Sequence, residues 1–228
     1  MKLLVIVPAY NAQSFIKESI SSILSQNILI QVVVIDDGSI DKTVSQIPKN
    51  SNINVIRNLK NMGTYYSINR ALVSSASDPS WTHFTVHGAD DVSLPGRFKA
   101  QLSKFSNGIL AVGCGYNRVD HSTGKVMSTT LKTDESVLIF SRKVFESIGY
   151  YATHRVGSDT EYKKRLLLCH PKSISTVPRV LIKSYLHGEN LTKKIPLGGS
   201  VRKKVVESFT SSHREMVKTK NYYQKFNP

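Results

Sequence analysis

The chain has 228 residues, of which 40% are hydrophobic and 21% are charged, and this composition is typical of one soluble globular domain with or without an appendage. No apolar run approaches the roughly 20 residues that cross a bilayer, and the short apolar run at residues 3–7 lacks the cleavage site of a signal peptide. The net charge of +15 predicts attraction to polyanions. The two cysteines, Cys114 and Cys169, need not pair, so we expect a cytoplasmic protein.

The start of the chain predicts a strand, a helix and a second strand. Residues 3–7 and 30–35 are continuous apolar runs rich in β-branched side chains, as in strands that are buried on both faces of a parallel sheet. Between them, Ile16, Ile20 and Ile23 recur at helical spacing. This order is a βαβ unit, and it predicts a parallel sheet.

Acidic residues gather where the second strand ends. Asp36, Asp37 and Asp41 follow that strand, and Gly38 between them allows a ligand to approach the backbone closely. Ligands of open parallel sheets bind outside the carboxyl ends of the strands. An ordinary capped turn is the alternative, and it explains one acidic residue better than three.

The rest of the chain continues the α/β pattern. Short strands are expected at residues 53–56, 81–86, 109–112, 137–140 and 180–185, and a hairpin is expected around Gly124. Helices are expected after Thr64 and Pro95, before Gly149, around Tyr162 and over residues 201–216. We therefore predict a mixed, mostly parallel central sheet flanked by helices. The expected units are a domain at 1–192, with halves 1–92 and 93–192, and a basic helical tail at 193–228.

Three further positions carry candidate chemistry. Asp90 and Asp91 follow the fourth strand, and two neighbouring carboxylates favour a divalent cation, although an acidic turn is the common alternative. Ser158 or Asp159 is expected to cap a helix, and a catalytic role is the alternative for Asp159. His187, in a polar loop after the last strand, is by itself a surface histidine.

The ordered motifs resemble those of the family 2 glycosyltransferases, which have the GT-A fold. The resemblance covers about residues 3 to 192 and includes Val7-Pro8-Ala9-Tyr10-Asn11, Val34-Ile35-Asp36-Asp37-Gly38-Ser39 with Asp41, Asn61-Met62-Gly63, Ala89-Asp90-Asp91, and Asp159 with Glu161 and Arg165. Each motif alone is weak, whereas the ordered set is specific.

The resemblance implies where a nucleotide-sugar donor, with a UDP-sugar favoured, would lie. The residues expected to contact it are Pro8, Ala9, Tyr10, Asn11, Asp37, Asp41, Asn61, Gly63, Ala89 and Asp90. Asp90 would correspond to the last acid of the family's DxD motif and would hold Mn²⁺ or Mg²⁺ against the diphosphate. Asp159 would correspond to the general base that deprotonates the acceptor hydroxyl.

This chain departs from the family pattern at informative positions. Gly88 stands where many members have the first Asp of the motif, so Asp91 or His187 is expected to complete the metal site. Ser158 replaces the acid that often precedes the base. The Gln-x-x-Arg-Trp signature of processive synthases is absent, because Trp81 is the only tryptophan. We therefore expect the addition of single sugars.

Three classes of function follow from these observations. The leading one is an inverting, metal-dependent glycosyltransferase that uses a glycan, lipid-linked or protein-linked acceptor. The second is a catalytically inactive protein that binds nucleotide sugars, which Gly88 and Ser158 suggest. A nucleic-acid binder is not expected, because apart from Tyr222 and Tyr223 the basic tail lacks interleaved aromatic residues. For the tail, we expect peripheral contact with an anionic membrane instead.

Overall fold

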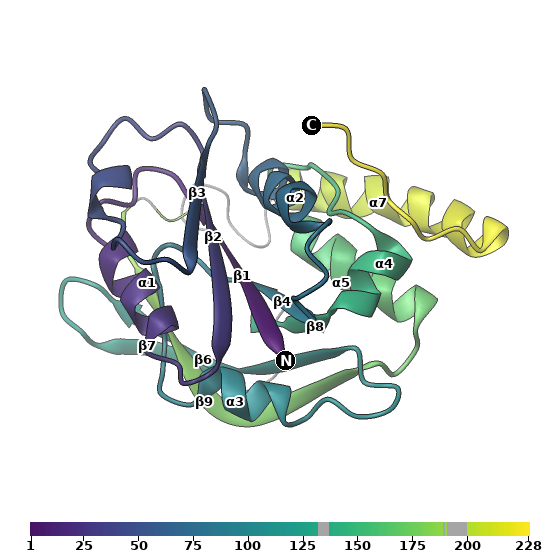
Figure 1. Ribbon diagram of the computed structural model, residues 1–228. Coiled ribbons are helices and arrows are strands. Elements are labelled where there is room, and N and C mark those ends of the chain that lie inside the picture. Colours follow the sequence, from purple (N-terminus) through teal and green to yellow (C-terminus); the bar gives the residue numbers. More distant parts are fainter. Residues whose placement is uncertain (132–136, 189, 191–199) are drawn as a thin grey trace.

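The computed structural model describes residues 1–131, 137–188, 190 and 200–228, and it contains one mixed sheet with helices on both faces (Figure 1). The strands are β1 (Lys2–Ala9), β2 (Leu29–Asp36), β3 (Ile53–Arg57), β4 (His83–Val86), β5 (Asp91–Ser93), β6 (Ala111–Asp120), β7 (Val126–Thr130), β8 (Ile139–Ser141) and β9 (Ile174–Leu186). The helices are α1 (Ile16–Leu24), α2 (Thr64–Ser75), α3 (Arg97–Leu102), α4 (Arg142–Ile148), α5 (Ser158–Cys169) and α7 (Ser200–Thr219), with a 3-10 turn η1 (Val44–Gln46).

The sheet has a parallel front half and a mixed back half. The strand order is β3-β2-β1-β4-β8-β6-β9-β5, and β7 pairs with β6. Strands β3, β2, β1 and β4 run parallel, as predicted, and β6 also runs parallel to β9. The pairs β4–β8, β6–β8, β6–β7 and β5–β9 are antiparallel. The predicted α/β class with a mixed central sheet is confirmed.

Strand β1 is buried on both faces because its side chains alternate between two hydrophobic clusters. Leu4 and Ile6 pack with apolar residues of α2, α4 and α5. Leu3, Val5 and Val7 point the other way and pack with residues of α1 and α3. The continuous apolar run in the sequence is therefore explained by two helical layers that cover the sheet.

The back half is organised around the long parallel pair β6–β9. Its register runs from Ala111 opposite Ile174 to Asp120 opposite Leu186. The other edge of β9 pairs with β5, where Asp91 lies opposite Ser184. This pairing brings the end of β9 beside the segment that follows β4, although the two are almost a hundred residues apart in the sequence.

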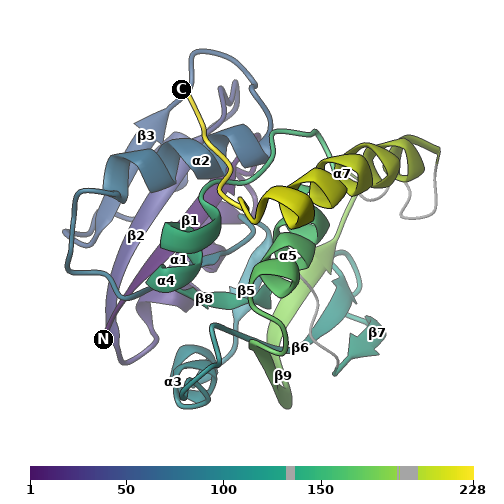
Figure 2. The same cartoon turned by 90° about the vertical axis from the view of Figure 1, so that its right-hand side faces the viewer.

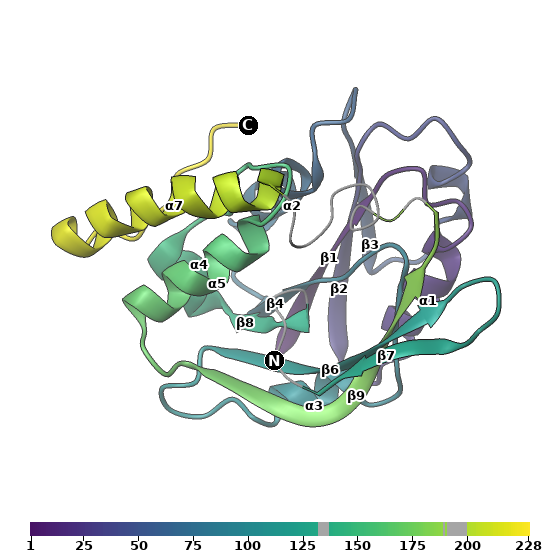
Figure 3. The same cartoon turned by 180° about the vertical axis from the view of Figure 1, so that it is seen from behind.

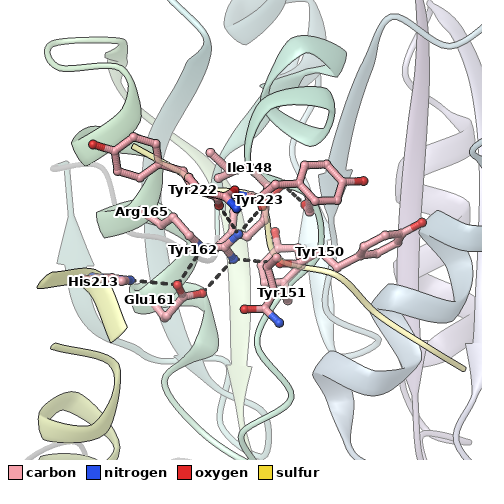
Figure 4. Close-up of polar contacts among 12 residues, drawn as sticks. Ile148, Tyr150, Tyr151, Glu161, Tyr162, Arg165, His213, Tyr222 and Tyr223 are labelled. Carbon is pink, nitrogen blue, oxygen red and sulfur yellow. Dashed lines mark hydrogen bonds and ion pairs between the residues drawn. The ribbon is translucent and has the colours of Figure 1, made fainter. Parts of the chain in front are cut away.

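A buried ionic network lies inside α5 and is drawn in Figure 4. Arg165 is fully buried and donates to both carboxylate oxygens of Glu161, at 2.7 and 2.9 Å. Its guanidinium also donates to the backbone carbonyls of Ile148 and Tyr150. On the opposite side of Glu161, His213 of α7 lies 2.9 Å from a carboxylate oxygen. The network therefore connects α5 to the end of α4 and to α7.

The C-terminal segment packs on the rest of the chain. Helix α7 runs beside α5, with Phe209 buried between them (Figures 2 and 3). After α7, the backbone N–H of Gln224 donates to Ile148 O and the N–H of Tyr150 donates to Gln224 O, both at 3.0 Å. The predicted boundary near residue 193 lies outside the described residues. Across the described ranges, every helix is too short or too polar to cross a membrane.

Replacement of Glu161 by Gln should destabilise the protein by about 3 kcal/mol, because it leaves the Arg165 charge buried without a counter-charge. Urea unfolding at pH 7 measures the change. Glu146→Gln is the matched control, since Glu146 forms the same i,i+4 pair with Arg142 but is exposed. It should cost no more than about 0.5 kcal/mol.

The cost of Glu161→Gln should also depend on pH. Burial opposes the charged form of Glu161, but hydrogen bonds from His213 and Arg165 outweigh it and lower the pKa of this carboxyl below its usual 4.5. The carboxylate therefore stabilises the folded state fully above pH 4.5, and this contribution is lost as the pH falls through the lowered pKa. A cost that is equal at pH 7 and at pH 3 would contradict the assignment.

Candidate active site

The carboxyl ends of the parallel strands meet at one edge of the sheet. In the register, Ala9 lies opposite Asp36 and Asp36 lies opposite Arg57. On the other side of β1, Ile6 lies opposite Val86. The segments that leave β1, β2, β3 and β4 therefore start side by side, as expected for a ligand-binding edge.

The loops after β1 and β2 are bound to each other. The backbone N–H of Asn11 donates to Ser39 Oγ at 2.9 Å, and the side-chain oxygen of Asn11 accepts from the N–H of Ile40 at 3.1 Å. Asp41 accepts from the backbone N–H of Gln13 at 3.2 Å. Burial of Asp41 is outweighed by hydrogen bonds from Thr43 and Gln13, so the pKa of Asp41 is lowered. Asn11 and Asp41 thus hold the two loops as one wall.

Four more residues that are predicted to contact the nucleotide-sugar donor lie along the same edge. Pro8 is half-buried and Ala9 is buried at the end of β1, whereas the Tyr10 side chain is 49% exposed just beyond it. Ala89 is buried in the segment between β4 and β5. Tyr10 is therefore the exposed member of this set and is open to an aromatic base.

Asp37 holds the loop that precedes α2. Its buried carboxylate accepts hydrogen bonds from the backbone N–H groups of Met62 and Gly63, at 2.9 and 2.8 Å. It also accepts from Asn58 Nδ2 at 2.6 Å and from Ser67 Oγ at 3.0 Å. Four protein donors satisfy most of the accepting capacity of one carboxylate. Asp37 therefore fixes the conformation of the loop that contains Met62 and Gly63.

Two close approaches complete this side of the edge. Gly38 has φ of 77°, and a Cβ there would lie 2.7 Å from the backbone carbonyl carbon of Lys60, so only glycine fits. Asn61 accepts a 2.6 Å hydrogen bond from Arg155, and the Arg155 side chain also lies over Gly63. The predicted residues Asn61 and Gly63 are thus in contact with the loop that leads into α5.

The structure brings His187 to Asp90. His187 Nε2 lies 3.1 Å from Asp90 Oδ2, and Asn190 Nδ2 donates to the same oxygen at 2.9 Å. The pairing of β5 with β9 causes this, because Tyr185 N–H also donates to Asp90 O at 3.3 Å. The imidazole of His187 stacks on Phe15 with ring centroids 4.4 Å apart. The histidine side chain is therefore oriented from two directions.

Asp91 lies differently from Asp90. It forms a side-chain hydrogen bond with Ser184, and burial together with the nearby Asp90 charge raises the pKa of Asp91 to about 6. A Cβ at Gly88 would lie 2.6 Å from Asp91 Oδ2 and 2.9 Å from Asp90 Oδ1. The two carboxylates therefore converge on the space that a side chain at position 88 would fill.

A buried cation lies near the aspartate pair. Arg97 is fully buried and donates to Ser93 Oγ at 2.9 Å and to Gln101 Oε1 at 3.1 Å, and it lies 3.2 Å from His87 Nδ1. Burial and the Arg97 charge hold the pKa of His87 well below its usual range, so this histidine is neutral. Arg97 also favours the charged form of Asp91, against the effect of burial.

The side chains at Asp90 provide some of the ligand atoms that a metal site needs. Carboxylate oxygen and imidazole nitrogen both bind Mn²⁺, and Asp90 and His187 supply one of each. Within the described ranges, no three His, Cys, Asp or Glu side chains form a group that could hold a metal ion. The participation of Asp91 stays a prediction.

Asp159 lies in the first turn of α5. The helix starts after Gly157 and has no side-chain cap, so the alternative that Ser158 or Asp159 caps it is wrong. The Asp159 carboxylate accepts from the N–H of Thr160 at 2.9 Å. Burial raises the pKa of Tyr151, and the Asp159 charge adds a smaller contribution. In the part of the chain that the structure describes, no hydrogen bond links Asp159 to Asp90. If both residues take part in one reaction, the sugar donor and the sugar acceptor would have to lie between them.

Sequence reasoning missed four residues that shape the site: Phe15, Asn190, Arg97 and Arg155. Asn190 had a local signal, because it follows His187 in the same polar loop. The other three carried none, since Phe15 and Arg97 resemble ordinary helix residues and Arg155 resembles an exposed loop residue.

Comparisons with known proteins give one consistent picture. The model of glycosyl transferase family 2 matches residues 4–167. A glycosyltransferase of Haemophilus influenzae is 28% identical over 215 residues, which cover 81% of this chain and 65% of that protein. A glycosyltransferase of Mycoplasma genitalium is 50% identical over 52 residues, which cover 22% of this chain and 18% of that protein. The chain thus spans less than two thirds of the length of these relatives.

Solved structures show the same fold. S. aureus TarS 1-349 in complex with UDP-GlcNAc has a TM-score of 0.73 at 16% identity, covering 95% of this chain and 70% of that fragment. The mannosyltransferase PcManGT of Pyrobaculum calidifontis, in complex with GDP-Man and Mn²⁺, has a TM-score of 0.68 at 18% identity, covering 93% and 64%. The family match, which extends over more than half of the chain, and the GT-A fold agree with the motifs along the sheet edge. The chain belongs to glycosyl transferase family 2.

Proposed function

We propose that this protein transfers one sugar from a nucleotide diphosphate sugar, with a UDP-sugar favoured, to a hydroxyl group of an acceptor, with inversion at the anomeric carbon. The observation that carries the proposal is the contact between Asp90 and His187 at the carboxyl edge of the sheet. The family to which the chain belongs, glycosyl transferase family 2, supports the same proposal. The likeness to TarS bound to UDP-GlcNAc supports a uridine donor.

In the proposed complex, the nucleotide lies over the loops that follow β1, β2 and β3. Tyr10 is exposed and offers an aromatic face to the base. Asn11 and Asp41 keep the first two loops together, and Asp37 holds the third. These residues orient the donor before reaction, which lowers the entropic part of the barrier.

Asp90 and His187 would hold a Mn²⁺ or Mg²⁺ ion together with the donor diphosphate. When bound, such an ion neutralises the charge that develops on the departing nucleotide diphosphate. Two of the similar structures, PcManGT and the glucosyl-3-phosphoglycerate synthase of Mycobacterium tuberculosis, are complexes with Mn²⁺. Asn190 donates to the same Asp90 oxygen and would keep that carboxylate oriented.

Asp159 is the proposed general base. It takes the proton of the acceptor hydroxyl while that oxygen attacks the anomeric carbon and the bond from this carbon to the diphosphate oxygen breaks. Its place in the first turn of α5 keeps it at the helix end that faces the loop of Arg155. A glycan, lipid-linked or protein-linked hydroxyl is the proposed acceptor class. Peripheral contact of the basic C-terminal segment with a membrane would suit the lipid-linked form.

The main test separates the two acidic roles. Asp159→Asn should lower kcat by about a thousandfold, because the base is lost. It should leave intact the rise in melting temperature that UDP and Mn²⁺ cause together, because a ligand that binds only the folded state stabilises it. Asp90→Asn should abolish the Mn²⁺-dependent part of that rise as well as turnover.

His121→Ala is the control for this test, because His121 packs edge-on against the same Phe15 that His187 stacks on, but no hydrogen bond connects it to Asp90 within the described residues. It should keep the Mn²⁺-dependent rise. Nucleotide binding without turnover on any donor in the parent protein would favour the catalytically inactive alternative. Activity that survives in Asp159→Asn would remove Asp159 from the mechanism.

Gly88→Ala should weaken metal-dependent UDP binding about tenfold while changing stability by less than about 0.5 kcal/mol. The added methyl would displace the carboxylate groups of Asp90 and Asp91, and because the nearest atoms belong to these side chains, the backbone can keep its position. Gly188→Ala is the control and should leave binding unchanged, because no atom of the described residues outside its chain neighbours lies within 4 Å of the added carbon. Calorimetric titration of UDP with and without Mn²⁺ measures both.

Asp37→Asn should cost about 2 kcal/mol, because the amide replaces an acceptor by a donor that faces the N–H groups of Met62 and Gly63. The loop at residues 60–63 should loosen, so the UDP-induced rise in melting temperature should shrink. Asp120→Asn removes a carboxylate that accepts three hydrogen bonds in an exposed turn, and it should affect neither measurement. An unchanged UDP response in Asp37→Asn would exclude Asp37 from the donor site.

A further inference from the structure

An open apolar groove lies between α5 and α7, on the helices that lie side by side in Figures 2 and 3. Its volume is about 640 Å³. Its lining residues are Lys164, Leu167 and Leu168 of α5 and Phe209, Thr210, His213, Arg214, Val217 and Lys218 of α7. None of the residues proposed for sugar transfer lines it.

The floor of the groove is hydrophobic and only partly covered. Phe209 is buried against α5, whereas Leu168 is 39% exposed and Val217 is 48% exposed. Val206 is 36% exposed. Thr210 follows it by four residues and Val217 follows Thr210 by seven, so the three lie on one stripe of α7. Apolar side chains from two neighbouring helices therefore face outward together, which marks a contact surface.

The rim of the groove is basic. Lys164 lies on the α5 side, and Arg214 and Lys218 lie on the α7 side. Residues 200–228 contain seven Lys and Arg against two Glu, so the segment that includes α7 carries a net positive charge. Lys218 is near Glu215 at 3.8 Å, but both side chains are more than 60% exposed and screened by water.

The groove has a fixed geometry because α7 is fastened to α5. His213 contacts the buried Glu161, and Arg165 reaches the carbonyl oxygen of Tyr222 beyond the end of α7 (Figure 4). At the other end of α7, a Cβ on Gly157 would lie 3.5 Å from Val205 Cγ1. The two walls of the groove therefore belong to one packed unit that includes the start of α5.

We propose that the α5–α7 groove is a docking surface for an anionic lipid bilayer. Lys164, Arg214 and Lys218 would pair with headgroup phosphates, while Leu168 and Val217 enter the boundary between headgroups and acyl chains. A second copy of this chain is the less suitable occupant, since two basic rims would repel each other.

Docking in this way sets the orientation of the active site. Val205 of α7 packs near Gly157, and Gly157 lies two residues before Asp159. A bilayer that holds the groove therefore also holds the end of α5 that carries the proposed base. The proposal goes beyond sugar transfer and does not rest on it, because binding to vesicles is measured without turnover.

The test is flotation of the full chain with vesicles of phosphatidylcholine and phosphatidylglycerol, compared with vesicles of phosphatidylcholine alone. The chain should float with the anionic vesicles and stay unbound with the neutral ones. The double variant Arg214→Glu/Lys218→Glu should lower the bound-to-free ratio at least about tenfold, and Val217→Asp should also lower it. All three side chains are on the outer surface, and circular dichroism together with the melting temperature of each variant checks that it folds.

The matched control is Lys99→Glu/Lys104→Glu, which changes the net charge by the same amount at two exposed residues on and just after α3, at the opposite end of the molecule (Figure 1). It should bind anionic vesicles like the parent. Equal loss in both double variants would reduce the effect to net charge and overturn the proposal. Unchanged binding in the groove variants would overturn it too, as would a dimer that Val217→Asp dissociates in the absence of vesicle binding.

Discussion

The structure depends on the burial of β1 on both faces. Leu3 to Val7 alternate between two hydrophobic clusters, so helices must cover both sides of the parallel half of the sheet. No face is then left for a polar ligand, and the hydrogen-bonding groups that could bind one are pushed to the strand ends. The parallel register places these ends in one row, from Asp36 beside Ala9 to the segment after Val86. The position of the candidate site is thus a consequence of how the core is packed.

At this edge, the acidic residues divide into two kinds. Asp36, Asp37 and Asp41 accept hydrogen bonds mainly from the protein itself, and they fix loops against one another. Asp90 and Asp91 lie close together, and burial together with the nearby Asp90 charge raises the pKa of Asp91 to about 6. Carboxylates of the first kind stabilise the shape of the site. In the second kind, the charged form of Asp91 is disfavoured, and a bound cation would relieve this cost, which fits the proposed site for a metal and a diphosphate.

Helix α5 connects the proposed general base with α7 on the surface of the molecule. Its first turn carries Asp159, and its interior carries Glu161 and Arg165, which bind the end of α4, α7 and the chain after α7. Because this ionic network is buried, movement of α7 would expose or unpair charge, and the cost of doing so keeps the helices in register. Helix α7 and the helix of the proposed base therefore form one packed unit.

The sequence by itself determined the α/β class, the order and approximate limits of most strands and helices, and the family. Apolar periodicity and β-branched runs report burial directly, and the ordered acidic motifs mark the strand ends. Only the tertiary structure decided that His187 meets Asp90, that Asp37 is bonded to the loop before α2, and that Glu161 pairs with His213. These contacts join residues between about 25 and 100 positions apart, and they depend on how strands pair and helices pack. The spacing of residues along the chain does not predict these contacts. Phe15 and Asn190, for example, meet His187 and Asp90 only when distant segments come together in the fold.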